Sequence, residues 1–390
     1  KCCICFIRLF IQRKGTYIYY MDNKIQKPLM EMRYADELAA LRKQDTGAKP
    51  ANWQLSPRAV RAFILGQSEP IELDGRQVTI TPKFFGDDAL VERAIITLAG
   101  NRGLMLVGEP GTAKTMLSEL LSAAICGIST NTVQGTAGTS EDNIKYSWNY
   151  ALLLAKGPVK EALVPSPVYI GMKRGIITRF EEITRCPLEI QDSLISIMSD
   201  RVLNIPELGE EGLLFASSGF NVIATANTRD KGINEMSSAL KRRFNFETVE
   251  PIRSVALESR IITDQCQGML AANGLEMPVQ EEVVDILAST FNELRNGTSF
   301  EKAKIQKMSG VMSTAEAVSV YYQSALDGYY YGDGSVSMRS LVQNLLGAVM
   351  KENKDDLPKL KDYFNGVVRL KAERQGGKWK EYYDNRTWLK

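Results

Sequence analysis

Apolar and polar positions along the chain follow two different patterns, which divide it near Pro251. Before that point, short apolar runs alternate with amphipathic stretches. The runs predict strands at 103–107, 130–135, 175–180 and 220–227, and the amphipathic stretches predict helices at 115–127 and 188–200. This alternation is typical of a parallel sheet with helices on both faces, so we expect an α/β core domain over residues 76–251.

After Pro251 the strand-like runs stop and helical spacing takes over. Amphipathic stretches predict helices at 253–270, 280–294, 313–331, 337–353 and 357–373. We expect an all-helical domain over 252–371 and a C-terminal tail over 372–390. Upstream of the core, residues 21–75 are polar with short helical patches, which indicates a small N-terminal extension.

The first 20 residues contain a short apolar segment, KCCICFIRLFI. A membrane-spanning helix needs about 20 apolar residues, and no small-residue cleavage site follows, as a signal peptide would require. Because MDNKIQK begins at Met21, we expect residues 1–20 to lie upstream of the native start and to have no function.

Composition narrows the chemistry that the chain can perform. With 48 basic and 46 acidic residues the net charge is +2, so no overall basic field favours nucleic acid. Histidine is absent, which excludes His-ligated metals and the Ser-His and Cys-His nucleophile pairs. The six cysteines form neither a disulfide framework nor paired zinc ligands. We interpret them as reduced thiols of a cytoplasmic protein.

The stretch GEPGTAKT (108–115) has the spacing GxxxxGK(S/T), with Ala113 in place of the second glycine. It lies between a predicted strand and helix. There the backbone amides surround nucleotide phosphates, Lys114 reaches the β and γ oxygens, and the Thr115 hydroxyl ligates Mg²⁺. We expect alanine to be accepted if residue 113 has ordinary helical dihedrals, since only a positive φ disfavours Cβ. The predicted binding residues are Gly108, Glu109, Pro110, Gly111, Thr112, Ala113, Lys114, Thr115 and Met116.

A second candidate element is GIITRFEEIT (175–184), an apolar strand that ends in two acids. Glu182 has the position of a carboxylate that polarises the attacking water, and Glu181 that of the residue holding the Mg²⁺ shell, through water. Nucleotide hydrolases usually have aspartate there. Glutamate is one methylene longer, so its geometry is expected to be less well fixed. Arg179 in the strand is expected to pair with Glu181 or to face a subunit interface.

Further candidate site residues follow these two motifs along the chain. Asn227 ends the strand VIATAN, where it can face the γ-phosphate, although asparagine also favours turns. In SSALKRRFNF, Lys241, Arg242 and Arg243 end a predicted helix, and these basic residues are either solvated surface or, in a ring, supply an arginine finger for a neighbouring subunit. Arg339 lies in the first turn of a predicted helix, where it either contacts phosphates or is a plain surface residue.

Together, GEPGTAKT, GIITRFEE, ATAN, LKRRF and SMRS resemble the AAA+ ATPases over roughly residues 77–350. Within these the chain resembles the MoxR branch, which is similar to the dynein-like and CbbQ/NorQ groups. The form GxPGTAKT and a helix-rich insertion, here SEDNIKYSWNYALLLAKGPVKEALVPSP, are typical of that branch. The segment 201–220 looks like the β-hairpin that precedes the sensor strand in these proteins.

This resemblance implies a P-loop αβα domain with a helical lid, which assembles into a ring, usually a hexamer, with ATP and Mg²⁺ at each interface. Members act as chaperone-like remodellers of a protein client, often with a von Willebrand factor A domain partner. By motif match, the resemblance implies catalytic and sensing roles for Glu182 (base), Asn227 (first sensor), Arg243 or Arg242 (finger) and Arg339 (second sensor).

Two other functions remain open from the sequence. Glu181 and Arg179 are compatible with an ATP-binding assembly switch that turns over little ATP. A nucleic-acid translocase is the other alternative, with basic pore residues Lys145, Lys156, Lys160, Lys173 and Arg174. The near-zero net charge weighs against the second.

Overall fold

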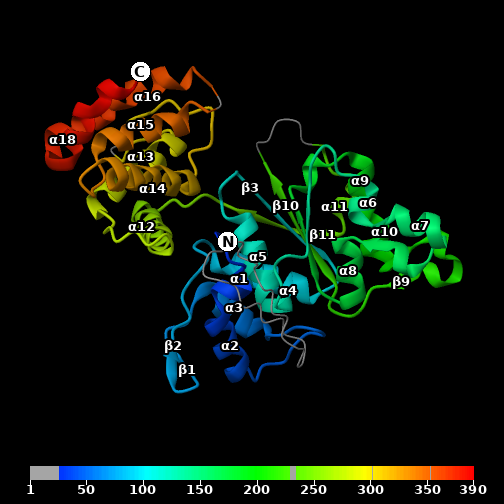
Figure 1. The fold of residues 1–390 in the computed structure, drawn as a ribbon. Coiled ribbons are helices and arrows are strands. Elements are labelled where there is room, and N and C mark those ends of the chain that lie inside the picture. Colours follow the sequence, from blue (N-terminus) through cyan, green and yellow to red (C-terminus); the bar gives the residue numbers. More distant parts are fainter. Residues whose placement is uncertain (1–25, 229–233, 301, 352) are drawn as a thin grey trace, which may run out of the picture.

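The computed structural model describes residues 26–228, 234–300, 302–351 and 353–390. At its centre is a five-stranded sheet in the order β11-β3-β10-β7-β4 (Figure 1). Every ladder in this sheet is parallel, which confirms the predicted α/β core. The strands are β3 (Gly103–Gly108), β4 (Thr132–Gln134), β7 (Ile177–Glu181), β10 (Asn221–Asn227) and β11 (Phe244–Val249).

The first face of the sheet is covered by the N-terminal half of the chain. Side chains alternate along β3, so Leu104 and Leu106 lie in the core on this face, while Met105 lies in the core on the other. Leu38 of the N-terminal extension and Leu121 share the first core, so the extension packs directly onto the αβα domain. Apart from β3, the elements between Met30 and Cys126 are α1 (Met30–Arg33), α2 (Ala35–Gln44), α3 (Pro57–Leu65), β1 (Ile71–Leu73), β2 (Arg76–Val78), α4 (Asp88–Ala99) and α5 (Lys114–Cys126).

The second face carries the insertion and two antiparallel hairpins, β5 with β6 and β8 with β9. The latter is the hairpin that the family resemblance implies. The predicted helix 188–200 is divided at Ser193, whose hydroxyl donates to the Ile190 carbonyl, a local bond that competes with helix continuation. The elements are α6 (Glu141–Ile144), β5 (Tyr146–Trp148), α7 (Tyr150–Lys156), η1 (Lys160–Ala162), β6 (Leu163–Pro165), α8 (Pro167–Arg174), η2 (Ile183–Arg185), α9 (Leu188–Asp192), α10 (Leu194–Asp200), β8 (Val202–Asn204), η3 (Pro206–Gly212), β9 (Leu213–Phe215) and α11 (Ser238–Lys241).

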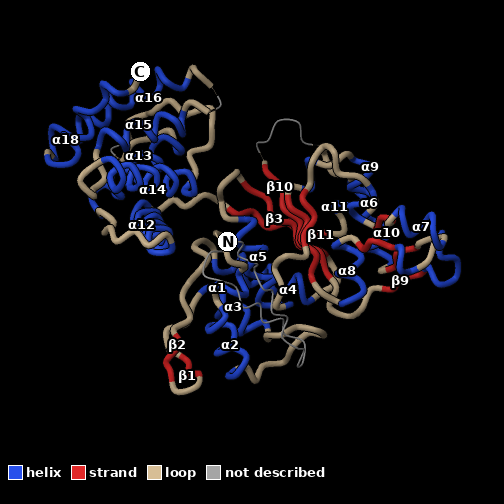
Figure 2. The backbone as a smooth tube through the Cα atoms, in the orientation of Figure 1, coloured by secondary structure: helices blue, strands red, loops and turns tan. Residues whose placement is uncertain are grey.

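The C-terminal region is helical, as predicted, and forms a separate body beside the sheet (Figure 2). This helical domain, from Val255 onward, is called the lid. Residues 372–390, expected as a tail, are largely helical. Tyr382 and Leu389 lie in the lid core, so the packed domain extends to Leu389. The other domain boundaries stay predictions. The elements are α12 (Val255–Ala272), α13 (Glu281–Asn296), α14 (Thr314–Tyr331), α15 (Met338–Val349), α16 (Asp356–Tyr363), η4 (Phe364–Val368), α17 (Arg369–Gln375), α18 (Gly377–Asp384) and η5 (Asn385–Trp388).

The expectation that residues 1–20 lie upstream of the native start falls outside the described residues. Within the described residues, none of the helices combines the length and apolar character that crossing a membrane requires.

Candidate nucleotide-binding site

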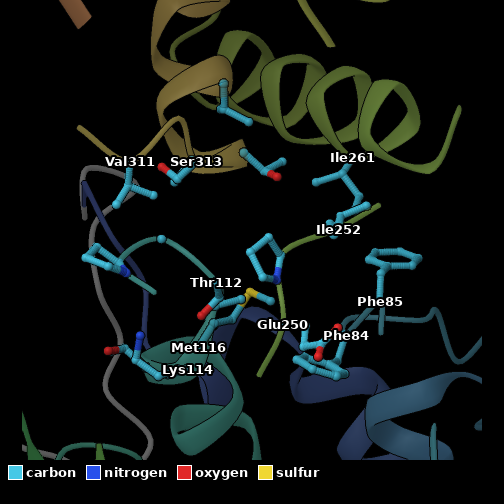
Figure 3. Close-up of a pocket in the computed structure, with 18 of the residues that line it drawn as sticks. Phe84, Phe85, Thr112, Lys114, Met116, Glu250, Ile252, Ile261, Val311 and Ser313 are labelled. Carbon is cyan, nitrogen blue, oxygen red and sulfur yellow. The ribbon is translucent and has the colours of Figure 1, made fainter. Parts of the chain in front are cut away.

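A cavity of about 460 Å³ lies at the carboxyl ends of β3 and β10. This is where open α/β sheets bind ligands, and the volume suits a small molecule. The loop before α5, the segment Phe84–Phe85 and the lid surround it (Figure 3). The ends of β7 and β10 and the connecting segment 250–252 complete the lining. Its apolar wall includes Phe84, Phe85, Ile252, Ile261, Val311 and Val318.

The loop before α5 has two residues with a left-handed backbone, Gly111 with φ 76° and Ala113 with φ 67°. The expectation of helical dihedrals at Ala113 is therefore wrong. This residue is the left-handed N-cap of α5, because the chain must reverse there to bring the helix amides toward the cavity. Left-handed backbone costs a non-glycine residue about 1–2 kcal/mol. The Lys114 ammonium donates to the carbonyl oxygens of Gly108 at 3.1 Å and Glu109 at 2.7 Å.

The lid touches this loop at Gly111. A Cβ placed on Gly111 would lie 2.4 Å from the Cβ of Ser313, so only glycine fits there. Ser313 is the N-cap of α14, and its backbone amide donates to the Glu316 carboxylate at 2.8 Å. This bond fixes the start of α14, which packs against the loop at Gly111.

Glu181 lies at the centre of a hydrogen-bond cluster at the end of β7. Its Oε2 accepts from the hydroxyls of Thr115 at 2.9 Å and Thr225 at 2.8 Å. Its Oε1 accepts from the Ser118 hydroxyl and from Arg179 Nη2, both at 2.7 Å. The carboxylate therefore joins α5, β7 and β10, and four donors fix the longer side chain.

Arg179 is buried beneath α5, with a relative exposure of 4%. Its Nε donates to Ser118 Oγ and its Nη1 to the Ser129 carbonyl. Of the two predicted placements, the structure shows the pairing with Glu181. Burial alone would raise the pKa of Glu181, but the Arg179 charge and three hydroxyl donors outweigh it and lower that pKa. Glu181 is therefore ionised at neutral pH.

Glu182 and Asn227 both line the cavity. Glu182 has a left-handed backbone with φ 54°, a conformation that costs about 1–3 kcal/mol and is concentrated at functional sites. Its amide donates to Thr225 Oγ1 at 2.9 Å, and its Oε2 pairs with Arg185 Nε at 2.8 Å. Asn227 stands opposite Gly108 in the parallel register, so the end of β10 lies beside the start of the loop.

The residues around Thr115 fit a magnesium ion. The Thr115 hydroxyl and the Glu181 carboxylate are oxygen donors of the kind that Mg²⁺ prefers, and they lie within hydrogen-bond distance of each other. Within the described ranges no cluster of three or more His, Cys, Asp or Glu residues could form a protein-only metal cage. Mg²⁺ commonly binds through few protein oxygens together with waters and substrate phosphates, which matches this arrangement.

Arg242 and Arg243 lie at the opposite end of the sheet from the loop. They precede β11, whose Phe244 pairs with Gly103 at the start of β3. At about 3.3 Å per residue, the length of β3 places them roughly 17 Å from Gly108. Arg243 donates to Ser199 Oγ at 2.9 Å and to the Ala239 carbonyl at 2.8 Å. Arg242 is exposed.

Arg339 is also remote from the cavity and is not one of the described residues that line it. It is exposed, and its guanidinium carbon lies 3.8 Å from the centre of the Trp388 ring in η5. The lid instead contributes Arg295 to the cavity. Arg295 pairs with the fully buried Glu258 at 2.6 Å and donates to the Ile252 carbonyl at 3.1 Å, which ties the lid to the segment that connects it with the sheet.

Sequence reasoning missed Ser118, Thr225 and the lid residues Arg295 and Ser313. Ser118 could have been found, because it lies one helical turn after Thr115 on the same face of the helix. Thr225 lies two residues before Asn227 in a strand, hence on the same face. No sequence pattern marks the two lid residues.

Comparisons with known proteins agree with this architecture. The family model described as AAA domain (dynein-related subfamily) matches residues 103–244, and that of the YehL-like AAA+ ATPase C-terminal domain matches residues 256–390. The uncharacterized protein YehL of Escherichia coli (strain K12) is 47% identical over 367 residues, covering 94% of this chain and 98% of that protein.

More distant similarities cover less of the chain. The uncharacterized protein SH1500 of Staphylococcus haemolyticus (strain JCSC1435) is 31% identical over 171 residues, which is 43% of this chain and 62% of that protein. The solved structure of NtrX from Brucella abortus in complex with ATP matches with a TM-score of 0.46 and 13% identity, covering 79% of this chain and 69% of that one. A match this weak supports no conclusion about the site.

Proposed function

The chain belongs to the YehL-like AAA+ ATPases, and we propose that it hydrolyses Mg²⁺-bound ATP in the cavity between the P-loop and the lid. The observation that carries this proposal is the meeting of three elements at Glu181. Thr115 of α5 and Thr225 of β10 both donate to the same Glu181 oxygen. This arrangement, with a hydroxyl, an ionised carboxylate and the end of β10 around one point, supports a magnesium site beside the phosphates.

Each cavity residue has a role in this proposal. Lys114 and the backbone N–H groups of residues 108–116, other than Pro110, bind the β- and γ-phosphates, and Thr115 and Glu181 hold Mg²⁺, the latter through water. When bound, Mg²⁺ neutralises the charge on the phosphates. Glu182 orients and polarises the attacking water, and Asn227 contacts the γ-phosphate. Support comes from the position of all these residues at one edge of the sheet.

The apolar wall of the cavity suits the base of the nucleotide. Phe84 and Ile252 lie on the side of the cavity away from Lys114 (Figure 3). An adenine ring placed there would stack on apolar and aromatic surface while its phosphates extend to the loop. In this proposal the lid closes the site from above, through Ser313 and Arg295.

We propose that the arginine finger comes from a neighbouring subunit. Neither Arg242 nor Arg243 reaches the cavity of its own chain, because they lie at the opposite end of β3. The Arg243 side chain is held by Ser199 and Ala239, whereas the side chain of Arg242 makes no hydrogen bond or ion pair within the described part of the chain. This difference favours Arg242 as the finger. A ring, with six subunits as in related ATPases, completes each site.

In this proposal turnover remodels a protein client, together with a partner that carries a von Willebrand factor A domain. The two inserted hairpins are joined, since the Tyr146 hydroxyl donates to Glu207 at 2.8 Å and Lys160 pairs with Glu211 at 2.8 Å. The joined unit exposes large apolar side chains, including Leu154 at 88% and Phe215 at 66%. Such exposed apolar groups support a protein-contacting role.

The proposal is tested by steady-state ATP hydrolysis with Mg²⁺. The wild-type protein should turn over ATP, and Glu182→Gln should bind ATP normally but lose at least about 100-fold in turnover, the usual value of a general base. Glu189→Gln removes an exposed carboxylate on α9 and is the matched control. Equal, background-level turnover from wild type and Glu182→Gln, with tight ATP binding by both, would instead favour the assembly switch.

A further inference from the structure

We propose that Arg179 is a positioning residue for the magnesium site, and that Arg179 and Glu181 act as one unit in place of the apolar residue and aspartate usual at these two strand positions. This inference rests on the proposed function. Arg179 is buried and does not line the cavity. In this inference it orients the Glu181 carboxylate, which in turn holds Mg²⁺.

The geometry of Arg179 carries the first step. It lies two residues before Glu181 in β7, so both side chains project from the same face of the sheet, beneath α5. Its Nε, Nη1 and Nη2 donate to three different acceptors, namely Ser118 Oγ, the Ser129 carbonyl and Glu181 Oε1. Each guanidinium nitrogen is therefore satisfied, and the planar fork has one fixed orientation.

The division of donors between the two carboxylate oxygens carries the second step. Arg179 and Ser118 occupy Oε1, whereas Thr115 and Thr225 occupy Oε2. Because Arg179 holds Oε1, the other carboxylate oxygen, Oε2, is turned toward the Thr115 hydroxyl. A glutamate has one more rotatable bond than an aspartate, and this contact fixes the added freedom.

Charge and reach carry the third step. The Glu181 side chain is 6% exposed and that of Arg179 is 5% exposed. Arg179 also lies 3.7 Å from Glu119, but Glu181 has no second cationic partner among the described residues, so loss of Arg179 leaves the buried Glu181 charge uncompensated. An aspartate at position 181 is shorter by about 1.5 Å, one C–C bond. Such a side chain could not contact Arg179 and Thr115 together. Arg179 and Glu181 therefore support the magnesium site only together: the arginine needs the longer carboxylate, and the longer carboxylate needs the arginine to orient it.

The test measures the Mg²⁺ dependence of ATP binding by isothermal titration calorimetry on the full chain. ATP is titrated in EDTA and at a series of MgCl₂ concentrations, for wild type, Arg179→Val, Glu181→Asp and the double variant. Each single substitution should weaken Mg²⁺ binding in the ATP complex by about 10- to 100-fold, as for other residues that orient a metal ligand. The double variant restores an apolar residue with aspartate, and should recover to within about 3-fold of wild type.

Affinity for ATP in EDTA should stay within about 3-fold of wild type in all variants, which shows that the P-loop is folded. Arg76→Val removes an exposed arginine in strand β2 and is the matched control. Wild-type Mg²⁺ affinity in Arg179→Val, or a double variant no better than the singles, would overturn the inference. If even the wild-type protein binds ATP without any Mg²⁺ dependence, the proposed function itself fails.

Arg179→Lys guards against variants that do not fold. Lysine keeps the positive charge but lacks the planar fork, so it cannot reach Ser118, Ser129 and Glu181 together. We expect Mg²⁺ affinity to fall several-fold in this variant while its thermal midpoint stays close to that of wild type. Unchanged Mg²⁺ affinity in Arg179→Lys would show that the fork has no positioning role.

Discussion

The Thr115 hydroxyl donates a 2.9 Å hydrogen bond to Glu181 Oε2, which joins the first turn of α5 to the end of β7. Thr225 of β10 donates to the same oxygen at 2.8 Å. A single carboxylate therefore connects the helix that follows the loop 108–113, the strand of the two acids and the strand that ends at Asn227. A change in its charge should alter both the stability of the core and the site.

Glu181→Gln should destabilise the protein in a pH-dependent way. The pKa of Glu181 in the folded protein is below its ordinary value, since the donors around it outweigh burial. Its contribution to stability is therefore present above the pKa of the unfolded chain, about 4.3, and is lost as pH falls through the lower folded pKa. The difference in free energy of unfolding between wild type and Glu181→Gln should be largest at pH 7 and should narrow below about pH 4.

Urea unfolding of both proteins at a series of pH values measures this difference. Glu189→Gln, which removes an exposed carboxylate on α9, is the control for the general effect of losing a charge. A difference that grows toward acid pH would contradict the prediction.

Much of this fold could be predicted because its signals are local. The run GLMLV, the turn GEPGTAKT and the amphipathic stretch after it predict strand, loop and helix in order, and β3 and α5 lie there. Spacing alone also indicated Lys114 and Thr115. The chain order of the two acids and Asn227 placed them at strand ends, because parallel strands present their carboxyl ends at one edge.

The unpredicted features depend on contacts between distant segments. The hydroxyls of Ser118 and Thr225 meet at Glu181 only because β7 lies between β10 and β4 and beneath α5. The contact between Gly111 and Ser313 requires the lid to be docked. Arg339 meets Trp388 because residues after 371 fold back onto the lid. Periodicity and local motifs contain no information on such contacts between residues that are far apart in the sequence.

Ala113→Gly should stabilise the protein. The left-handed backbone at Ala113 costs about 1–2 kcal/mol, and glycine removes that cost while losing about 0.5–1 kcal/mol of chain entropy. We expect a net gain of about 0–1.5 kcal/mol in the free energy of unfolding, measured in urea. ATP affinity should change by less than about 3-fold, since the backbone amide is retained.

Ala155→Gly is the matched control, because Ala155 is an exposed residue within helix α7. The same change there should destabilise by about 1 kcal/mol. A loss of stability in both variants would show that the backbone at residue 113 is not strained.

Trp388→Leu should tighten ATP binding if Arg339 acts as the second sensor. Arg339 stacks on Trp388 in this structure, so it must leave the ring to contact phosphate. An exposed cation–π contact of about 0.5–1 kcal/mol opposes that move and lowers the apparent affinity by about 2- to 5-fold. Calorimetry should show this gain in Trp388→Leu and its loss in Trp388→Leu with Arg339→Ala. The gain persisting without Arg339 would argue against a sensor role.

Arg242→Ala should abolish ATP turnover, and mixing this variant with a second inactive variant, Lys114→Met, should restore it. Arg242 is exposed and lies at the end of β3 remote from its own cavity, so its proposed target is the site of a neighbour. The variant should bind ATP like wild type but hydrolyse it about 10³-fold more slowly. Lys114→Met should be inactive because it loses the phosphate-binding ammonium.

Mixing these two inactive proteins discriminates between a finger that acts in trans and one that acts in cis. In mixed rings some interfaces combine the intact cavity of an Arg242→Ala subunit with the intact Arg242 of a Lys114→Met subunit, so ATP hydrolysis should reappear. Arg243→Ala is the control: it loses the contacts to Ser199 and Ala239 and should lower the thermal midpoint while retaining most turnover. If the mixture stays inactive although light scattering shows mixed assemblies, Arg242 does not act across the interface.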